Sequence, residues 1–226
     1  MGSIPAGVRE RIVEIGRIAG LGVSRETLLA LETHVTLLER WQPVQNLVAP
    51  ATLPDAWKRH VLDSAQALPL VSGASRLCDL GSGAGFPGLV LAILLSGRPG
   101  TSVHLVESNQ RKAAFLRQVA QATGAPAVVE PVRIETAAAV PERRFDVVTA
   151  RALAPLDRLL SLAAPLLSGE TVAILHKGGG YREEIDAAVH HFRFDLVIHD
   201  SITDPDGRLL EIRNVRPRAG GTRPGG

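Results

Sequence analysis

The N-terminal part of the chain carries apolar side chains at helical spacing. Val8–Ile18 has apolar residues three and four positions apart, and Ser24 can cap a second helix that runs through Glu39. After a connector rich in proline and asparagine, the pattern predicts a third helix from about Asp55 to Leu68. The buried side of the second helix is expected to hold Leu28, Leu29, Leu31, Val35 and Leu38. We therefore predict an N-terminal helical extension over residues 1–72.

From Arg76 onward, short apolar runs alternate with amphipathic stretches, which predicts a mostly parallel seven-stranded sheet with helices on both faces. The predicted strands are Arg76–Leu80, Val103–Glu107, Ala127–Glu130, Phe145–Ala150, Thr171–His176, Leu196–Asp200 and Leu209–Val215. The predicted helices are Gly88–Ser96, Gln110–Thr123, Leu156–Leu167 and Arg182–Phe192. The turn Asp204–Gly207 is too short for a helical crossover, so the last two strands are expected to be antiparallel. We predict an α/β, Rossmann-like domain over residues 73–216 and a disordered Arg/Gly/Pro tail over 217–226.

Composition adds little about the partner. The chain has 226 residues and a net charge of only +2. The four arginines after Glu211 account for this positive excess, so the net charge says little about the partner. The aromatic content of 4% argues against a dedicated single-strand nucleic-acid binder. Cys78 is the single cysteine, which fits a reducing compartment. The charge-free run Leu80–Gly97 is interrupted by glycines and a proline, so we expect no membrane span. The single cysteine and the lack of a basic-then-apolar signal layout predict a cytoplasmic location, and nothing in the sequence suggests more than a monomer.

The stretch LCDLGSGAGFPG, residues 77–88, can be read in two registers. From Gly83 it spells the dinucleotide fingerprint G-x-G-x-x-G, and from Asp79 it spells D-x-G-x-G-x-G, the loop of S-adenosylmethionine (SAM) enzymes. A carboxylate at Asp79 would repel a pyrophosphate and attract the ammonium and sulfonium of SAM. We favour SAM for this reason, and a nucleotide-dependent oxidoreductase stays as an alternative. A competing role for Asp79 is to cap a helix or brace the loop, and Glu107 could reach a ribose hydroxyl or be a surface acid.

Further segments carry a resemblance to a known family. They are NLV (46–48), RHVLDS (59–64), DLGSGAGFPG (79–88), ESNQRKAAFL (107–116), RIE (133–135), ARAL (150–153) and KG (177–178). In this order, over Trp41 to Lys177, the chain resembles the bacterial small-subunit rRNA methyltransferase G family, also called glucose-inhibited division protein B. The resemblance implies a class I SAM-dependent methyltransferase fold and methyl transfer to N7 of a guanosine in 16S rRNA of the small ribosomal subunit.

The resemblance also implies a set of site residues. The SAM site would be formed by Asp79, Gly81, Gly83, Gly85, Phe86, Glu107 on the ribose, Ile134 and Glu135 beside the adenine, and Arg151. Arg59 and His60 would belong to the surface that meets the RNA or closes over SAM, and Lys177 would contact an RNA phosphate. Simpler roles compete with three of these: a salt-bridged Arg151, a structural hydrogen bond between His60 and Asp63, and a solvated Lys177. Lys112 is expected on the outer face of a helix.

Absent motifs narrow the chemistry. No Asn/Asp-Pro-Pro-aromatic motif follows the fourth strand, and there is no Cys/His cluster with metal spacing, so we expect no metal. Guanine N7 carries a lone pair and no proton, so its methylation needs no general base. We name none, and we assign Arg151 to orienting the base. A methyltransferase acting on a small molecule or on another RNA stays as an alternative.

Overall fold

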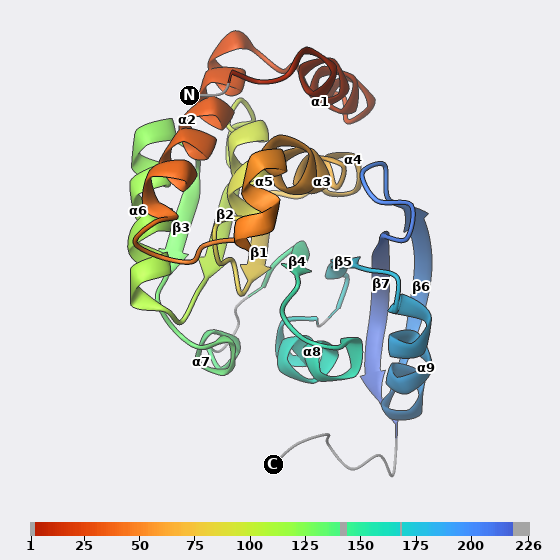
Figure 1. Cartoon of the computed structure of the whole chain (residues 1–226). Helices are drawn as coiled ribbons and strands as arrows, with labels where there is room; N and C mark the ends of the chain where they lie inside the picture. The colour runs from red at the N-terminus through yellow and green to blue at the C-terminus, as the bar shows by residue number, and fades with distance from the viewer. Residues whose placement is uncertain (1–2, 141–143, 168, 219–226) are drawn as a thin grey trace.

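The structure is a computed structural model that describes residues 3–140, 144–167 and 169–218. Its centre is a seven-stranded sheet with the order β3-β2-β1-β4-β5-β7-β6 (Figure 1). The strands are β1 (Arg76–Leu80), β2 (Ser102–Val106), β3 (Ala127–Glu130), β4 (Val147–Arg151), β5 (Val172–Lys177), β6 (Phe192–Asp200) and β7 (Arg208–Pro217). The first five strands are parallel and β7 runs antiparallel to β5 and β6, which confirms the predicted α/β class.

Helices cover both faces of this sheet (Figure 1). They are α5 (Gly88–Leu94), α6 (Gln110–Thr123), α7 (Ile134–Ala138), α8 (Leu156–Ala163) and α9 (Tyr181–His191). Successive strand side chains point to opposite faces, so Leu77 packs with α5 and α6 in one core whereas Cys78 packs with α8 and α9 in the other. The helix predicted after the fourth strand, Leu156–Leu167, ends at Ala163 and is followed by a 3₁₀ turn that contains Pro165. The short helix α7 was not predicted.

The N-terminal extension packs onto the core on the side of α5 and α6. It contains α1 (Ala6–Ile18), α2 (Arg25–Trp41), the 3₁₀ helix η1 (Pro50–Asp55), the π-helix η2 (Trp57–Leu62), α3 (Asp63–Ala65) and α4 (Leu68–Val71). Ser24 Oγ accepts a hydrogen bond from Thr27 N at 3.2 Å, as the cap prediction requires. Leu29 is 49% exposed, so its assignment to the buried side was wrong. The third predicted helix is not a regular α-helix. Its hydrogen-bonding pattern changes along the chain from 3₁₀ to π to α geometry.

The C-terminal hairpin is longer than predicted. Strand β6 begins at Phe192 instead of Leu196, and β7 continues to Pro217. Arg218 N donates to His191 O at 2.8 Å, so the ordered chain extends two residues past the expected boundary. Residues 219–226 of the expected tail lie outside the described residues. No helix of the described chain is long and apolar enough to span a membrane.

The strand order changes direction between β1 and β4, which places their carboxyl ends side by side at a switch point. In open α/β sheets, ligands bind in the crevice at such a point. The glycine loop follows β1 and the segment Ala152–Pro155 follows β4. The fold therefore brings these two loops together, and η2 lies near them through contacts described below.

Candidate active site

The glycine loop is held in a tight conformation that only glycine adopts easily. Gly81 has a φ of 66°, and a Cβ there would lie 2.6 Å from Leu153 Cδ1. The N–H groups of Gly81 and Ser82 donate to Val106 O at 2.9 and 3.1 Å. The loop is thus fastened to the end of β2, while its other side lies against the loop that follows β4.

Asp79 lies beneath this loop. Its side chain is 1% exposed, and Thr149 Oγ1 donates to its Oδ1 at 2.7 Å. Burial raises the pKa of the Asp79 carboxyl to about 6, against the hydrogen bonds from Thr149 and Ser82, which lower it. Asp79 does not line either of the cavities described next. Its contacts favour the loop-bracing alternative over a direct contact with a cationic ligand.

Two adjoining cavities open at the carboxyl edge of the sheet, with volumes of about 780 and 310 Å³. Both are within the range typical of small-molecule sites. The residues that line both are Gly81, Gly83, Lys112, Ala152 and Leu153. The smaller cavity contains the predicted Glu107, Ile134 and Glu135, and the larger contains the predicted Arg59, His60, Phe86, Arg151 and Lys177. Gly85 lines neither cavity. Lys112 was expected on the outer face of a helix, but it lines both cavities.

Glu107 follows β2 in the smaller cavity and is 8% exposed. Its Oε2 accepts a hydrogen bond from Gly83 N at 2.9 Å, and its Oε1 accepts one from Asn109 N at 2.8 Å. A carboxylate has about four acceptor positions, so each oxygen keeps capacity for one more donor. This geometry suits a ligand that offers two neighbouring hydroxyl groups.

Arg151 ends β4 in the larger cavity, and η2 and α3 surround its guanidinium. Nη1 donates to Arg59 O and to Asp63 Oδ2, both at 3.0 Å, and Nη2 lies 3.0 Å from His60 Nδ1. The guanidinium carbon lies 5.3 Å from the centroid of the Phe86 ring. Among the described residues, these bonds leave Nε–H and one Nη2 hydrogen of Arg151 for another partner. The salt-bridged and the site interpretations of Arg151 are therefore compatible.

His60 is fixed in one tautomer. Because Arg151 can only donate, His60 Nδ1 accepts, and its Nε2–H donates to Thr52 Oγ1 at 2.8 Å. Burial, and then the neighbouring Arg151, lower the pKa of His60 to about 4. The ring is 8% exposed. His60 is thus a neutral part of the cavity wall, as a residue that closes over SAM would be, whereas Arg59 is exposed at the rim.

Asp63 links Arg151 to the turn between β6 and β7. Its Oδ1 accepts hydrogen bonds from Thr203 Oγ1 at 2.7 Å and from Gln66 Nε2 at 2.8 Å. Gln66 in turn accepts from Ile202 N at 2.8 Å. The turn after β6 therefore forms the far wall of the larger cavity. Sequence reasoning missed this wall, because nothing local connects positions 140 residues apart.

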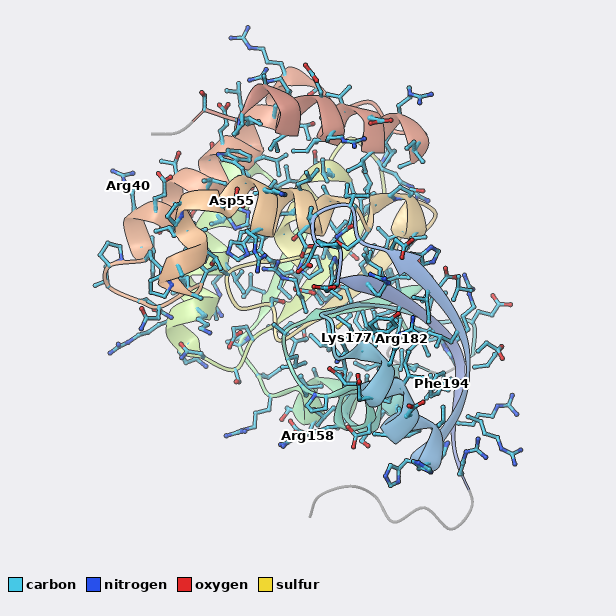
Figure 2. All side chains as sticks on the ribbon, turned by 45° about the vertical axis from the view of Figure 1, so that its right-hand side comes forward. Arg40, Asp55, Arg158, Lys177, Arg182 and Phe194 are labelled. Carbon is cyan, nitrogen blue, oxygen red and sulfur yellow. The ribbon has the colours of Figure 1, made fainter. Side chains whose placement is uncertain are left out.

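Lys177 is ion-paired and largely buried, so the interpretation as a solvated lysine was wrong. Its side chain is 8% exposed, and Nζ donates to Glu184 Oε2 at 2.6 Å and to Ala154 O at 2.7 Å. Figure 2 shows Lys177 beside Arg182 at the start of α9, the helix that carries Glu184. Lys177 therefore holds the loop after β4 against α9, and its charge is paired with Glu184.

Phe86 is stacked between two histidines from the extension. His34 of α2 lies 4.9 Å from the Phe86 ring centroid at an interplanar angle of 18°, and His60 lies at 5.0 Å and 24° on Phe86. Sequence reasoning missed His34, since a lone histidine among apolar helix positions gives no signal. Within the described part of the chain, no group of three or more histidine, cysteine or carboxylate side chains could hold a metal ion.

Comparison with known proteins gives independent evidence on the family of this chain. A family model described as rRNA small subunit methyltransferase G matches residues 27–210. The chain is 50% identical over 203 residues to ribosomal RNA small subunit methyltransferase G of Rhizobium meliloti (strain 1021), covering 88% of this chain and 94% of that protein. It is 53% identical over 194 residues to the protein of the same name from Parvibaculum lavamentivorans, covering 85% of each.

Solved structures share the fold. An O-methyltransferase from Bacillus cereus in complex with SAH aligns with a TM-score of 0.56 and 14% identity, covering 81% of this chain and 91% of that one. A mutant of MtNAS in complex with S-adenosylmethionine aligns with a TM-score of 0.53 and 20% identity, covering 92% of this chain and 79% of that one. These likenesses place the sheet and its helices among class I methyltransferase folds.

Proposed function

We propose that this chain, which belongs to the rRNA small subunit methyltransferase G family, transfers the methyl group of SAM to N7 of a guanosine in 16S rRNA. SAM-dependent methylation of small-subunit rRNA is the activity of the family. The observation that carries the finer proposal is the larger cavity, whose lining holds an arginine with free donors, while both histidines described in that lining are engaged or buried.

The residues present fit SAM. The two cavities meet over the glycine loop, so a ligand with two ends can lie across it. Glu107 would accept hydrogen bonds from the ribose hydroxyls, and Ile134 would pack beside the adenine in the smaller cavity. When bound, SAM supplies a methyl group that its sulfonium activates. The N–H groups of Gly81, Ser82 and Gly83 already donate to Val106 O and Glu107 Oε2, so they are not free to hold a pyrophosphate, which argues against the dinucleotide alternative.

The lining of the larger cavity supports a nucleophile that carries no proton. Among its described imidazoles, His60 has both nitrogens engaged, and His176 Nε2 donates to Asp63 O at 3.0 Å while its Nδ1 is buried. Burial lowers the pKa of both rings. The carboxylates of Asp63 and Glu184 are paired with Arg151 and Lys177, and Asp204, on the turn after β6, accepts a hydrogen bond from Asp206 N at 3.0 Å. Guanine N7 needs no base, whereas an exocyclic amine or a hydroxyl would have to lose a proton.

We assign Arg151 to orienting the target guanine. Its Nε–H and its remaining Nη2 hydrogen can donate to guanine O6, which leaves N7 free to attack. The guanidinium is held by Asp63 and His60, so its donors are oriented before the base arrives. Well-oriented reactants can lower a barrier by about 7–11 kcal/mol. Alignment, with exclusion of water, is therefore the main contribution that we expect from this chain.

The target base must leave its helix to reach this cavity. N7 lies on the major-groove edge, which side chains cannot reach in A-form RNA. A splayed-out or single-stranded guanosine could enter past the exposed Arg59 at the rim. Phosphates of the flanking strand would then face Arg59. We therefore propose Arg59, in place of Lys177, as the RNA contact. A cytoplasmic location and a monomeric state remain part of this proposal, and sedimentation of the purified chain would test the latter.

Two measurements test the function. Calorimetry with SAM and with NAD should give binding only for SAM. Tritiated-methyl transfer to small subunits from cells that lack the gene should label the RNA. Label that is absent from the RNA and appears in a small-molecule extract would instead support the small-molecule alternative.

A further inference from the structure

His34 on α2 is a buried polar residue that the proposed chemistry does not use. It is 0% exposed and lies among apolar positions of the helix, including Leu31 and Leu38. Its Nε2 lies 2.9 Å from Ala84 O in the glycine loop. A carbonyl oxygen only accepts, so Nε2 carries the proton and donates to Ala84 O.

The other nitrogen of this ring has no partner. His34 Nδ1 is buried without a hydrogen bond among the described residues. Burial also lowers the pKa of His34 to about 4, so the ring is neutral at neutral pH. A buried polar atom without a partner is unfavourable, and a leucine would fill the same space without that penalty. The helix therefore retains a destabilising atom at the point where it touches the loop.

His34 is the first ring of a three-ring column. His34 stacks on one side of Phe86 at 4.9 Å, and His60 stacks on Phe86 at 5.0 Å. His60 then accepts the hydrogen bond from Arg151 at 3.0 Å. Ala84 and Phe86 both line the larger cavity. The column thus joins α2, the glycine loop and η2, and it touches the loop at two of its lining residues.

We propose that His34 is a positioning residue for the cofactor, which fixes the Ala84 carbonyl and the Phe86 ring of the SAM-binding loop from the side of the extension. This inference rests on the proposed function only in taking SAM as the ligand of the loop. It also assigns a role to the extension: α2 sets the shape of the cofactor pocket as well as covering the sheet.

Two substitutions separate the two contacts. His34→Phe keeps a ring against Phe86 but removes the donor to Ala84 O, and His34→Gln keeps a donor but removes the ring. Leu31→Val is the matched control, because Leu31 is 0% exposed on the same helix and is not among the cavity-lining residues. We would measure the Kd for SAM by calorimetry, KM for rRNA, and thermal unfolding for all four proteins.

We expect His34→Phe to raise the Kd for SAM about tenfold, which corresponds to ~1.4 kcal/mol, and His34→Gln to raise it about threefold. KM for rRNA should stay within about twofold, and Leu31→Val should lower the unfolding temperature without changing the Kd for SAM. A purely structural role would move the unfolding temperature of both His34 variants and leave their Kd within twofold of the unchanged chain, and that result would overturn the proposal. If the unchanged chain failed to bind SAM, the proposed function would fail instead.

Discussion

Replacing Asp63 by asparagine removes one charge at the centre of the network around Arg151. Each oxygen of Asp63 now accepts from donors: Oδ2 from Arg151 at 3.0 Å, and Oδ1 from Thr203 at 2.7 Å and from Gln66 at 2.8 Å. An asparagine amide has only one oxygen. In either orientation its NH₂ group must therefore face a donor, so the substitution breaks a contact on one side.

The cost follows from the burial of this pair. The side chains of Arg151 and Asp63 are 17% and 18% exposed, so water can replace the lost contact only in part. A hydrogen bond to a charged group contributes about 1.5–3 kcal/mol. If that energy holds the guanidinium in its reactive orientation, its loss lowers kcat by about 10- to 100-fold. The Kd for SAM should change little, because Asp63 bonds to Arg151, Thr203 and Gln66 and not to Glu107, the residue proposed to hold the ribose.

Single-turnover methyl transfer at saturating SAM and rRNA measures this directly. Asp206→Asn is the matched control, since it removes a charge from an exposed position on the neighbouring turn after β6. We expect Asp63→Asn to lose turnover with unchanged SAM affinity, and Asp206→Asn to behave as the unchanged chain. Turnover of Asp63→Asn within twofold of the unchanged chain would refute the positioning of Arg151 by Asp63.

Further predictions follow from other contacts of the site. Glu107→Gln should raise the Kd for SAM about tenfold in calorimetry, because its amide NH₂ must face the N–H of Gly83 or of Asn109. Arg59→Ala should reduce the salt dependence of rRNA binding by about one unit of slope, whereas Lys177→Met should lower the unfolding temperature and leave that slope unchanged, since Lys177 is ion-paired at 2.6 Å. Acidification should destabilise the chain as the pH falls from 6.5 towards 4, because burial lowers the pKa of folded His34 to about 4 and the unfolded chain then binds more protons. Urea unfolding at several pH values should show that the free energy of unfolding of His34→Phe depends less steeply on pH over that window. An unaltered pH dependence would contradict this cause.

Local patterns predicted the parts of the fold that local physics determines. The alternation of strands and helices, the cap at Ser24 and the tight glycine loop follow from side-chain period, capping and φ, and the structure has them. The turn after β6 was predicted for the same reason, since its short length forces an antiparallel pair. The helix over η2 was predicted only in part, because its change to π geometry depends on its packing partners.

The site was less predictable, because its contacts join distant segments. Periodicity cannot reveal that Asp63 meets Thr203 or that His34 meets Ala84, and no short motif marks either pair. The sequence also does not give side-chain orientation: Asp79 lies beneath the loop, and Lys177 is paired with Glu184. Residue type suggested which charges matter, but only the packed structure distinguishes a charge offered to a ligand from one already paired.

The identity of the methylated atom tests the account most directly. Small-subunit RNA labelled by the purified chain would be digested to nucleosides and separated by chromatography against standards. The account predicts that the label migrates with 7-methylguanosine, because N7 is the nucleophile that needs no base, and both histidines described in this cavity lining are engaged or buried while Asp63 and Glu184 are ion-paired. Label on an exocyclic amine or on a ribose hydroxyl would require a proton acceptor in this cavity, and would contradict it.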